Sequence, residues 1–324
     1  MAIEVSIVCL VYNQEKYVDK MLKSLVNQKT NFEYEILVHD DASTDLSQKI
    51  IKDYATKFPD LVKPILQTEN QYSKGINPNR QYNYPRVKGK YIAYCEGDDY
   101  WESLDKLQKQ YDALEKETSC SICVHDVQCV FRDGKTSDKK FPPIKIQNGI
   151  ITSEQYLRLE LKDAGWLFQT SSYFIRTEVI KKFVKEYSVH YPVGDLPLVL
   201  FSLQHGDCFY LNETMSCYRL NSGGVMTQLS SRKRRISHCK KMIEGHLDFD
   251  KRTKFKYHEY FEYAILSKEV EILMLEKKYH EMLAPKYKDV RKKMNTKKKM
   301  LIGLGCVFPE LADTLEIKKN SWTE

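Results

Sequence analysis

Long hydrophobic runs are missing from this sequence. No stretch approaches the roughly 20 apolar residues that a helix needs to cross a bilayer, and the apolar run near the C-terminus covers only residues 301–308. No basic leader with a following apolar segment precedes the first strand-like residues, so no secretory signal is predicted. These absences exclude an integral membrane protein and predict a cytoplasmic protein that at most touches a membrane surface.

A disulfide framework is also missing. The nine cysteines are an odd number and are scattered along the chain, which suits a reducing compartment and predicts free thiols. One group, formed by Cys120, Cys123, His125 and Cys129, has the donor types that zinc accepts. The same stretch has the Val- and Ile-rich alternation of a half-buried strand, which sends successive side chains to opposite faces. We therefore favour a strand here over a zinc site.

Charge is distributed unevenly along the chain. Residues 231–324 contain 23 Lys and Arg against 14 Asp and Glu, a net charge of +9, whereas residues 1–230 have a net charge of −2. The basic C-terminal third suits either a solvated helical face or contact with an anionic membrane surface, and both alternatives stay open. The basic clusters at residues 232–235 and 297–299 predict only non-specific attraction to nucleic acid, because no reading module accompanies them.

The sequence does contain a regular alternation of strand-like and helix-like segments. Short apolar runs predict strands at residues 5–11, 34–38, 62–66 and 91–95, and amphipathic spacing predicts helices at residues 16–28, 43–58 and 104–114, the second capped by Ser43 or Thr44. This order predicts an α/β fold with a mostly parallel central sheet flanked by helices, whose ligands bind beyond the carboxyl ends of the strands. We divide the chain into residues 1–120, residues 121–230 and a helical C-terminal extension at residues 231–324.

Acidic residues follow two of the predicted strands. Asp40 and Asp41 close the second strand, and Glu96-Gly97-Asp98-Asp99 follows the fourth. Crowded carboxylates repel each other, so a site that gathers them usually supplies a cation. Mg²⁺ and similar hard ions prefer one or two carboxylates together with phosphate oxygens and water. Capping of the next helix is the alternative for either pair alone, but parallel neighbours would bring both pairs to one edge.

Three segments in this order resemble glycosyltransferases of family two, which have the GT-A fold. They are residues 5–8 leading to Tyr12-Asn13, residues 38–45, and residues 89–101, where Glu96-Gly97-Asp98-Asp99-Tyr100-Trp101 resembles the D-x-D-type metal motif of that family. The strong likeness spans roughly the first 115 residues and continues more weakly to about residue 226. The resemblance implies a nucleotide-diphosphate sugar donor, most commonly a UDP-sugar, and Mn²⁺ or Mg²⁺ as cofactor.

The resemblance also implies roles for individual residues at the donor site. Asp41 matches the residue that binds the nucleotide base, and Val11, Tyr12 and Asn13 line the same pocket. Glu96 and Asp98 match the D-x-D carboxylates, which contact ribose and metal, and we expect Asp98 and Asp99 to hold the metal. How the three acids share these tasks is left open.

Later segments imply the remaining roles. Asp195 resembles the carboxylate that begins a helix and serves as catalytic base, although an ordinary helix cap is the alternative. Arg219 belongs to a segment, residues 218–225, that resembles a loop near the donor diphosphate, with Asn221 in place of the usual His. The stretch containing Trp166, Gln169 and Thr170 suits acceptor sugar binding, or else a core strand.

The resemblance therefore implies an inverting glycosyltransferase that moves one sugar per encounter onto a hydroxyl of a glycan or lipid-linked acceptor, in synthesis of a surface polysaccharide such as capsule. Processive relatives carry membrane spans and a Gln-x-x-Arg-Trp motif, neither of which is found. A nucleotidyltransferase is the nearest alternative, yet its Gly-rich basic loop is replaced by Tyr12-Asn13-Gln14-Glu15. A non-catalytic nucleic-acid- or membrane-binding protein is a further alternative, and self-association is compatible with all of these.

Overall fold

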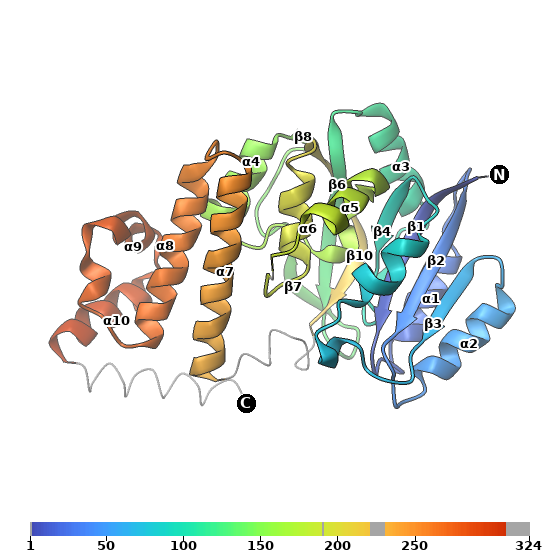
Figure 1. Ribbon diagram of the computed structural model, residues 1–324, viewed down its shortest axis with the longest axis horizontal. Coiled ribbons are helices and arrows are strands. Elements are labelled where there is room, and N and C mark those ends of the chain that lie inside the picture. Colours follow the sequence, from blue (N-terminus) through green and yellow to red (C-terminus); the bar gives the residue numbers. More distant parts are fainter. Residues whose placement is uncertain (1, 190, 221–230, 309–324) are drawn as a thin grey trace. The chain divides into compact units, whose positions relative to one another are not determined.

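The computed structural model describes residues 2–189, 191–220 and 231–308 (Figure 1). The chain divides into two compact units. The first lies within Met1–Ser188 and Asp195–Ser222, and the second within Val189–Gly194 and Gly223–Glu324.

The first unit is built on one sheet, which has ten strands in the described part of the chain. The main strand order is β3-β2-β1-β4-β9-β6-β10-β5, with β7 paired to β6 and β8 paired to β10. The bounds are β1 Ile3–Val11, β2 Glu33–Asp40, β3 Val62–Leu66, β4 Tyr91–Tyr94, β5 Tyr100–Trp101, β6 Cys120–Val130, β7 Thr136–Phe141, β8 Gly149–Ile151, β9 Phe174–Arg176 and β10 Asp207–Arg219.

The first four strands form the predicted parallel layer. β1 pairs in parallel with β2 and with β4, and β2 pairs in parallel with β3. β1, β2 and β4 are buried along most of their length, as expected for parallel strands that are covered by helices. Helices α1 (Val18–Val26), α2 (Ser47–Lys57) and α3 (Lys106–Lys116) contribute to one hydrophobic core with β1, β2 and β4. The α/β fold flanked by helices is thereby confirmed.

The predicted cap of α2 is wrong. The N-cap position of α2 is occupied by Leu46, where no side chain makes a capping hydrogen bond. The Ser43 hydroxyl instead donates to Asp40 at 2.6 Å, and the backbone N–H of Thr44 donates to Asn13 at 2.8 Å. Asp45 accepts from the N–H of Ser47 at 2.9 Å. The two predicted capping residues are therefore used to tie the ends of β1 and β2 together.

The second half of the sheet is mixed. β9 is antiparallel to both β4 and β6, whereas β6 and β10 are parallel to each other. The segment at residues 132–148, which has the polar composition of a loop, contains β7, an antiparallel partner of β6. Helices α4 (Ser153–Arg158), α5 (Thr177–Glu186) and α6 (Asp195–Ser202) belong to the same half. Because β9 bridges β4 and β6, the sheet continues without a break past residue 120.

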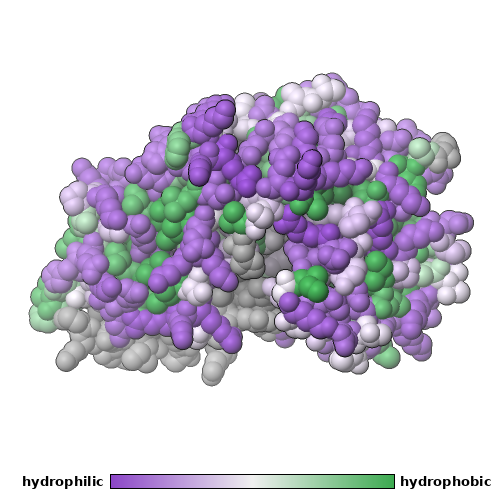
Figure 2. All heavy atoms as spheres, in the orientation of Figure 1, coloured by the Kyte–Doolittle hydropathy of each residue, from purple (hydrophilic) through white to green (hydrophobic). Residues whose placement is uncertain are grey.

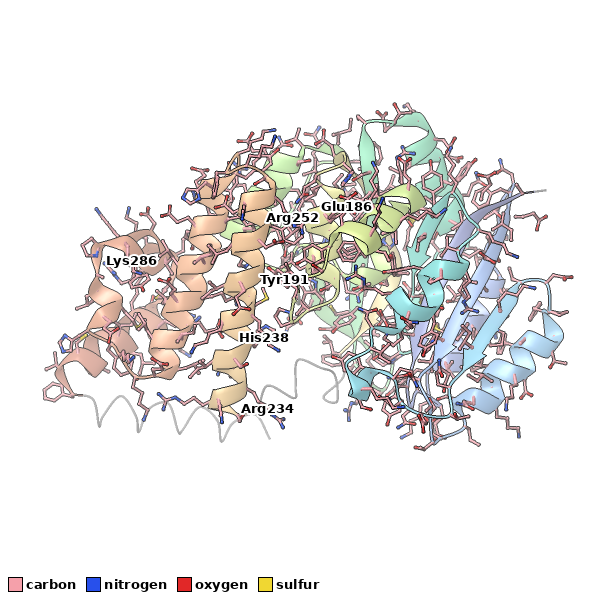
Figure 3. All side chains as sticks on the ribbon, viewed as in Figure 1. Glu186, Tyr191, Arg234, His238, Arg252 and Lys286 are labelled. Atoms are coloured by element: carbon pink, nitrogen blue, oxygen red, sulfur yellow. The ribbon has the colours of Figure 1, made fainter. Side chains whose placement is uncertain are left out.

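The second unit is helical. Its main elements are α7 (Arg232–Arg252), α8 (His258–Leu275), α9 (Lys288–Lys293) and α10 (Thr296–Val307), and α7 and α8 lie side by side (Figure 1). The hydroxyl of Tyr191, a residue labelled in Figure 3, is 2.9 Å from Nδ1 of His246 on α7. Figure 2 shows hydrophobic patches over this unit, whose exposed apolar residues include Leu247, Leu283, Met300 and Val307. None of the helices described has the length and apolarity that a bilayer span requires.

Candidate active site

The ends of β1, β2 and β4 are locked together by backbone hydrogen bonds. The N–H of Asp41 donates to Val11 at 2.9 Å, and the N–H of Gly97 donates to Leu10 at 2.9 Å. A Cβ at Gly97 would lie 3.1 Å from the Leu10 carbonyl oxygen. The acidic loop after β4 approaches the end of β1 this closely because Gly97 has no side chain.

Tyr12 and Asn13 form a rigid turn directly after β1. Asn13 has a φ of 53° and Ala42, at the end of β2, has a φ of 66°, a left-handed conformation that is costly for residues other than Gly. The Ser43 hydroxyl accepts from the N–H of Asn13 at 2.8 Å, which holds the two turns together. Tyr12 stays 48% exposed. The turns thus keep an aromatic side chain accessible at the edge where donor binding is predicted.

Asp41 is buried beside this turn and already accepts hydrogen bonds. Its two carboxylate oxygens accept from the N–H groups of Gln71 at 2.8 Å and Tyr72 at 3.0 Å. Nε2 of His39 lies 3.5 Å from the same carboxylate, and burial lowers the pKa of His39 despite this neighbour. In this geometry Asp41 positions the segment after β3. Its contact with a nucleotide base stays a prediction.

Carboxylates gather at the end of β4. Burial raises the pKa of Glu96 to about 8, and the negative charges of Asp98 and Asp195 add to the effect. Asp99 is fully buried, and burial followed by repulsion from Asp98 raises its pKa well above the usual range. The N–H of Arg219 donates to one Asp99 oxygen at 2.9 Å, and the amide of Gln169 donates to the other at 3.2 Å. Neutral donors partly compensate the buried charge of Asp99, and a bound cation would compensate the whole cluster.

These acids provide hard oxygen donors, the type that Mg²⁺ and Mn²⁺ prefer. The crowding that raises their pKa values is what a divalent cation would relieve, so the donor set fits such an ion. Among the residues that the structure describes, no three His, Cys, Asp or Glu side chains meet in a metal-binding arrangement.

Asp195 begins α6 and faces the same cluster. One of its oxygens accepts from the N–H of Leu196 at 2.8 Å, and the Thr170 hydroxyl donates to the carboxylate. Burial raises the pKa of Asp195, although these hydrogen bonds oppose the shift. Gln169 and Thr170 are neighbours in the chain and contact Asp99 and Asp195 respectively, so the start of α6 lies close to the loop after β4. The helix-capping and the catalytic interpretation of Asp195 are thus compatible.

Arg219 is buried at the end of β10 and has structural partners. Its Nε donates to the carbonyl of Asp98 at 3.0 Å, and its Nη1 donates to the carbonyl of Phe131 at 3.1 Å. The guanidinium carbon lies 4.3 Å from the centre of the Tyr17 ring. These contacts connect β10 to the loops after β4 and β6. A contact with the donor diphosphate stays a prediction, and Asn221, from the same predicted loop, lies outside the described residues.

The three residues predicted for acceptor binding have different roles. Gln169 and Thr170 hold the carboxylates of Asp99 and Asp195, as given above. Trp166 is 41% exposed, and its ring centre lies 4.6 Å from that of Phe141 and 5.6 Å from that of Tyr218. Trp166 is thus exposed, Thr170 is half-buried and Gln169 is buried, and contact of any of them with an acceptor stays a prediction.

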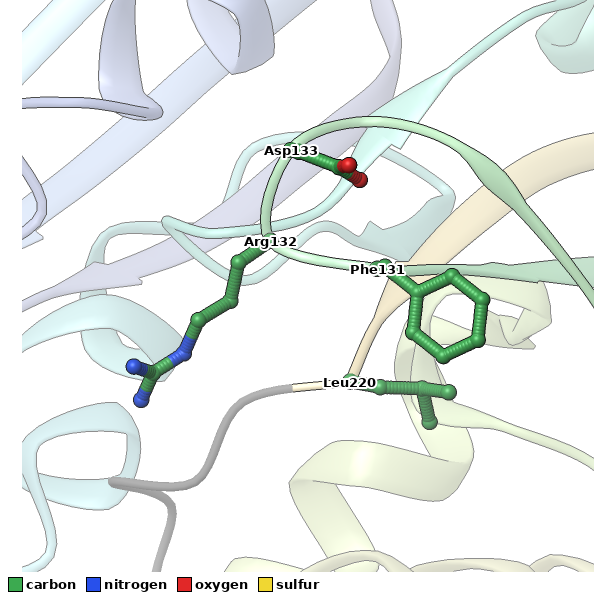
Figure 4. Close-up of a pocket in the computed structure, with 4 residues that line it drawn as sticks. All are labelled: Phe131, Arg132, Asp133 and Leu220. Atoms are coloured by element: carbon green, nitrogen blue, oxygen red, sulfur yellow. The ribbon is translucent and has the colours of Figure 1, made fainter.

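A shallow pocket lies at the turn between β6 and β7. It is lined by Phe131, Arg132, Asp133 and Leu220 (Figure 4). In this view the Arg132 side chain extends away from the apolar side chains of Phe131 and Leu220. The pocket adjoins the Phe131 carbonyl that holds Arg219, but it contains none of the carboxylates described above.

Tertiary structure adds residues that sequence reasoning did not select. Phe141 and Tyr218 join Trp166 from β7 and β10, and Gly97 sets the approach of the acidic loop. Gly97 could have been found from its place inside the acidic motif. Nothing in the sequence indicated that Phe141 would lie beside Trp166, because the pairing depends on a strand at residues 136–141.

Comparison with known proteins identifies the family. The family model described as glycosyl transferase family 2 matches residues 6–183. Because this is more than half of the chain, the protein belongs to glycosyl transferase family 2. The match spans the acidic motifs after β2 and β4.

Two curated relatives illustrate the breadth of the similarity. An uncharacterized protein of Mycobacterium tuberculosis is 32% identical over 224 residues, which are 68% of this chain and 60% of that protein. TuaG of Bacillus subtilis, named for teichuronic acid biosynthesis, is 29% identical over 135 residues, covering 42% of this chain and 51% of TuaG. The chain thus spans about 60% of the length of the first of these relatives.

Two solved structures share the fold. S. aureus TarS 1-349 in complex with UDP-GlcNAc has a TM-score of 0.59 and 17% identity, covering 83% of this chain and 73% of that chain. The mannosyltransferase PcManGT from Pyrobaculum calidifontis, in complex with GDP-Man and Mn²⁺, has a TM-score of 0.56 and 13% identity, covering 95% and 80%. The predicted GT-A fold is thereby confirmed.

Proposed function

We propose that this protein is an inverting glycosyltransferase that moves a sugar from a nucleoside diphosphate donor onto a hydroxyl of a glycan or lipid-linked glycan acceptor. The observation that carries the proposal is the convergence of Asp195 with the carboxylates at the end of β4, in a chain of glycosyl transferase family 2. A base facing a cation-binding acidic loop is the arrangement that such a reaction needs.

The donor site comprises the turns after β1 and β2. Tyr12 supplies an accessible aromatic surface, and Val11 and Asn13 fix its position through the contacts with Asp41 and Ser43. Asp41 and Glu96 lie on the flanking loops and take the nucleoside part of the donor. UDP is our first choice of nucleotide, which the UDP-GlcNAc complex of TarS supports.

Asp98, with Asp99, would hold Mn²⁺ or Mg²⁺. Asp98 is half-buried, whereas each oxygen of Asp99 already accepts one N–H and retains a second lone pair. The two carboxylates leave coordination positions for the donor diphosphate, the usual arrangement for Mg²⁺. When bound, the ion supplies positive charge that stabilises the departing nucleoside diphosphate. The Mn²⁺ complex of PcManGT supports this assignment. Arg219 holds the acidic loop through its hydrogen bonds to Asp99 and to the Asp98 carbonyl.

Asp195 would take the acceptor proton. Its carboxylate is held by Leu196 and Thr170, so it is oriented before the acceptor arrives. Its raised pKa brings the carboxylate nearer to the operating pH, which improves a general base. Attack by the deprotonated hydroxyl on the face opposite the leaving diphosphate inverts the anomeric centre.

The acceptor belongs to a surface polysaccharide pathway in this proposal, a setting that the similarity to TuaG supports. The basic helical unit would bring the enzyme to an anionic membrane surface where a lipid-linked acceptor resides. The exposed lysines 297–299 and the exposed apolar residues Met300 and Val307 of α10 are suited to such a surface.

Thermal-shift screening of nucleotide sugars with and without Mn²⁺ tests the donor and the cation together. Selective stabilisation by one nucleotide sugar, dependent on Mn²⁺, is expected. Product analysis then separates transferase from nucleotidyltransferase, because the former releases a nucleoside diphosphate and the latter pyrophosphate. Stabilisation by nucleoside triphosphates with release of pyrophosphate would overturn the proposal.

A further inference from the structure

Three aromatic side chains from distant parts of the first unit form one cluster beside the candidate base. Phe141 comes from β7, Trp166 from the segment before the turn at residues 170–172, and Tyr218 from β10. The ring centres of Phe141 and Trp166 are 4.6 Å apart, those of Trp166 and Tyr218 are 5.6 Å apart, and those of Phe141 and Tyr218 are 6.2 Å apart. We call these three residues the aromatic platform.

The platform presents an open surface rather than a filled core. Trp166 is 41% exposed, and Phe141 and Tyr218 are half-buried. Packing against the other two rings restricts the Trp166 side chain. Less side-chain entropy of Trp166 is therefore lost when a ligand stacks on it. An exposed indole held by two other rings is a pre-organised contact surface.

The platform adjoins the reacting groups. Tyr218 precedes Arg219, whose N–H donates to Asp99 at 2.9 Å. Burial raises the pKa of Tyr218, and the charges of Asp99, Asp98 and Asp195 act in the same direction. Trp166 lies four positions before Thr170, whose hydroxyl donates to Asp195. Two members of the platform are thus close in the chain to residues that contact Asp99 and Asp195.

We propose that the aromatic platform binds the pyranose ring of the acceptor, with one ring hydroxyl directed toward Asp195. This inference rests on the proposed function and adds to it the residues that would hold the ring of the acceptor. The C–H face of a pyranose is flat and apolar enough to stack on aromatic rings, while its edge carries the hydroxyls that the carboxylates nearby can accept from. An open-chain polyol phosphate lacks such a face, so the platform selects a sugar ring.

Binding of simple sugars tests the platform directly. Saturation-transfer NMR of the full chain would use methyl glycosides of glucose, galactose, mannose and N-acetylglucosamine, each with and without UDP and Mn²⁺. We expect Trp166→Ala to weaken the bound glycoside about 10-fold, from the energy of an aromatic contact. Trp166→Phe, which keeps a stacking ring, should stay within about 3-fold of the wild type, and Phe255→Ala, at an aromatic residue of the helical unit that is 60% exposed, should have no effect.

In a transfer assay, Trp166→Ala should raise the KM for the acceptor about 10-fold and leave the KM for the donor unchanged. The inference is overturned if the wild type binds no pyranoside, if Trp166→Ala binds pyranosides as the wild type does, or if glycerol phosphate oligomers bind in their place. Failure of nucleotide binding would instead count against the proposed function, and a pyranoside signal that depends on Trp166 would then still support the platform.

Discussion

Replacing Asp195 by Asn is the sharpest test of the active site. Asn keeps an oxygen that can accept from the N–H of Leu196, now at 2.8 Å, and from the Thr170 hydroxyl. The fold and the start of α6 should therefore be preserved, with a change in the free energy of unfolding within about 1 kcal/mol. The side chain can no longer accept a proton. A positioned general base contributes roughly 10²–10⁴-fold to the rate, which corresponds to about 3–5 kcal/mol of the activation barrier.

The assay is transfer from the donor found by thermal shift, with donor affinity measured by calorimetry. We expect kcat to fall roughly 10²–10⁴-fold while donor affinity stays unchanged. Asp207→Asn is the matched control. Asp207 also accepts from a backbone N–H, that of Ser153 at 2.7 Å, but it lies at the start of β10, at the opposite end of that strand from Arg219. Transfer by Asp195→Asn within about 10-fold of the wild type would refute the assignment of the base.

The pH dependence gives a second readout of Asp195. Burial raises its pKa in the folded protein, and a base must be ionised to act. The kcat of the wild type should rise with pH through this raised pKa and then level off. At pH values between the pKa of Asp195 in the unfolded chain and its higher pKa in the folded protein, the folded state binds more protons than the unfolded state. The free energy of unfolding of the wild type therefore falls as pH rises through this interval. Asp195→Asn lacks this loss, and its stability relative to the wild type should increase with pH across that interval.

Three further predictions concern the metal, the helical core and the membrane. Asp98→Ala should abolish the Mn²⁺-dependent part of the donor thermal shift, and an undiminished shift would contradict the metal assignment. Gly245→Ala would place Cβ 2.0 Å from the Tyr191 ring and should lower the free energy of unfolding by about 1–3 kcal/mol in urea melts; Gly303→Ala, with no described atom within 4 Å, should stabilise by up to about 1 kcal/mol. Changing lysines 297–299 to Gln should reduce partition onto phosphatidylserine vesicles roughly 100-fold, and unchanged partition would exclude this surface.

The local pattern of the sequence was sufficient to predict the strands and helices of the parallel half of the sheet. Strands β1 to β4 and helices α1 to α3 lie where apolar runs and helical spacing predicted them, within a few residues. Hydrophobic burial on both faces makes such strands continuous apolar runs, and this signal is local. The acidic residues after β2 and β4 were located for the same reason, since they follow directly on those runs.

The contacts within the site depended on tertiary structure. The sequence suggested Gln169 for the acceptor, and this stays a prediction; what the structure adds is the hydrogen bond from its amide to Asp99, a residue 70 positions away. Arg219, which the sequence suggested for the donor phosphates, donates to carbonyls of two other loops, and its contact with the phosphates stays a prediction. Both outcomes follow from the cost of burying a polar group without a partner, and the available partners are set only when distant segments meet.

By itself, the sequence determined the family, the parallel half of the sheet and the positions of the acids, because short apolar runs and short motifs indicate all three. The tertiary structure alone decided which donor each buried carboxylate accepts from, and it alone placed Phe141 and Tyr218 beside Trp166. Those arrangements depend on which segments far apart in the chain pack together, and no local pattern of the sequence specifies that.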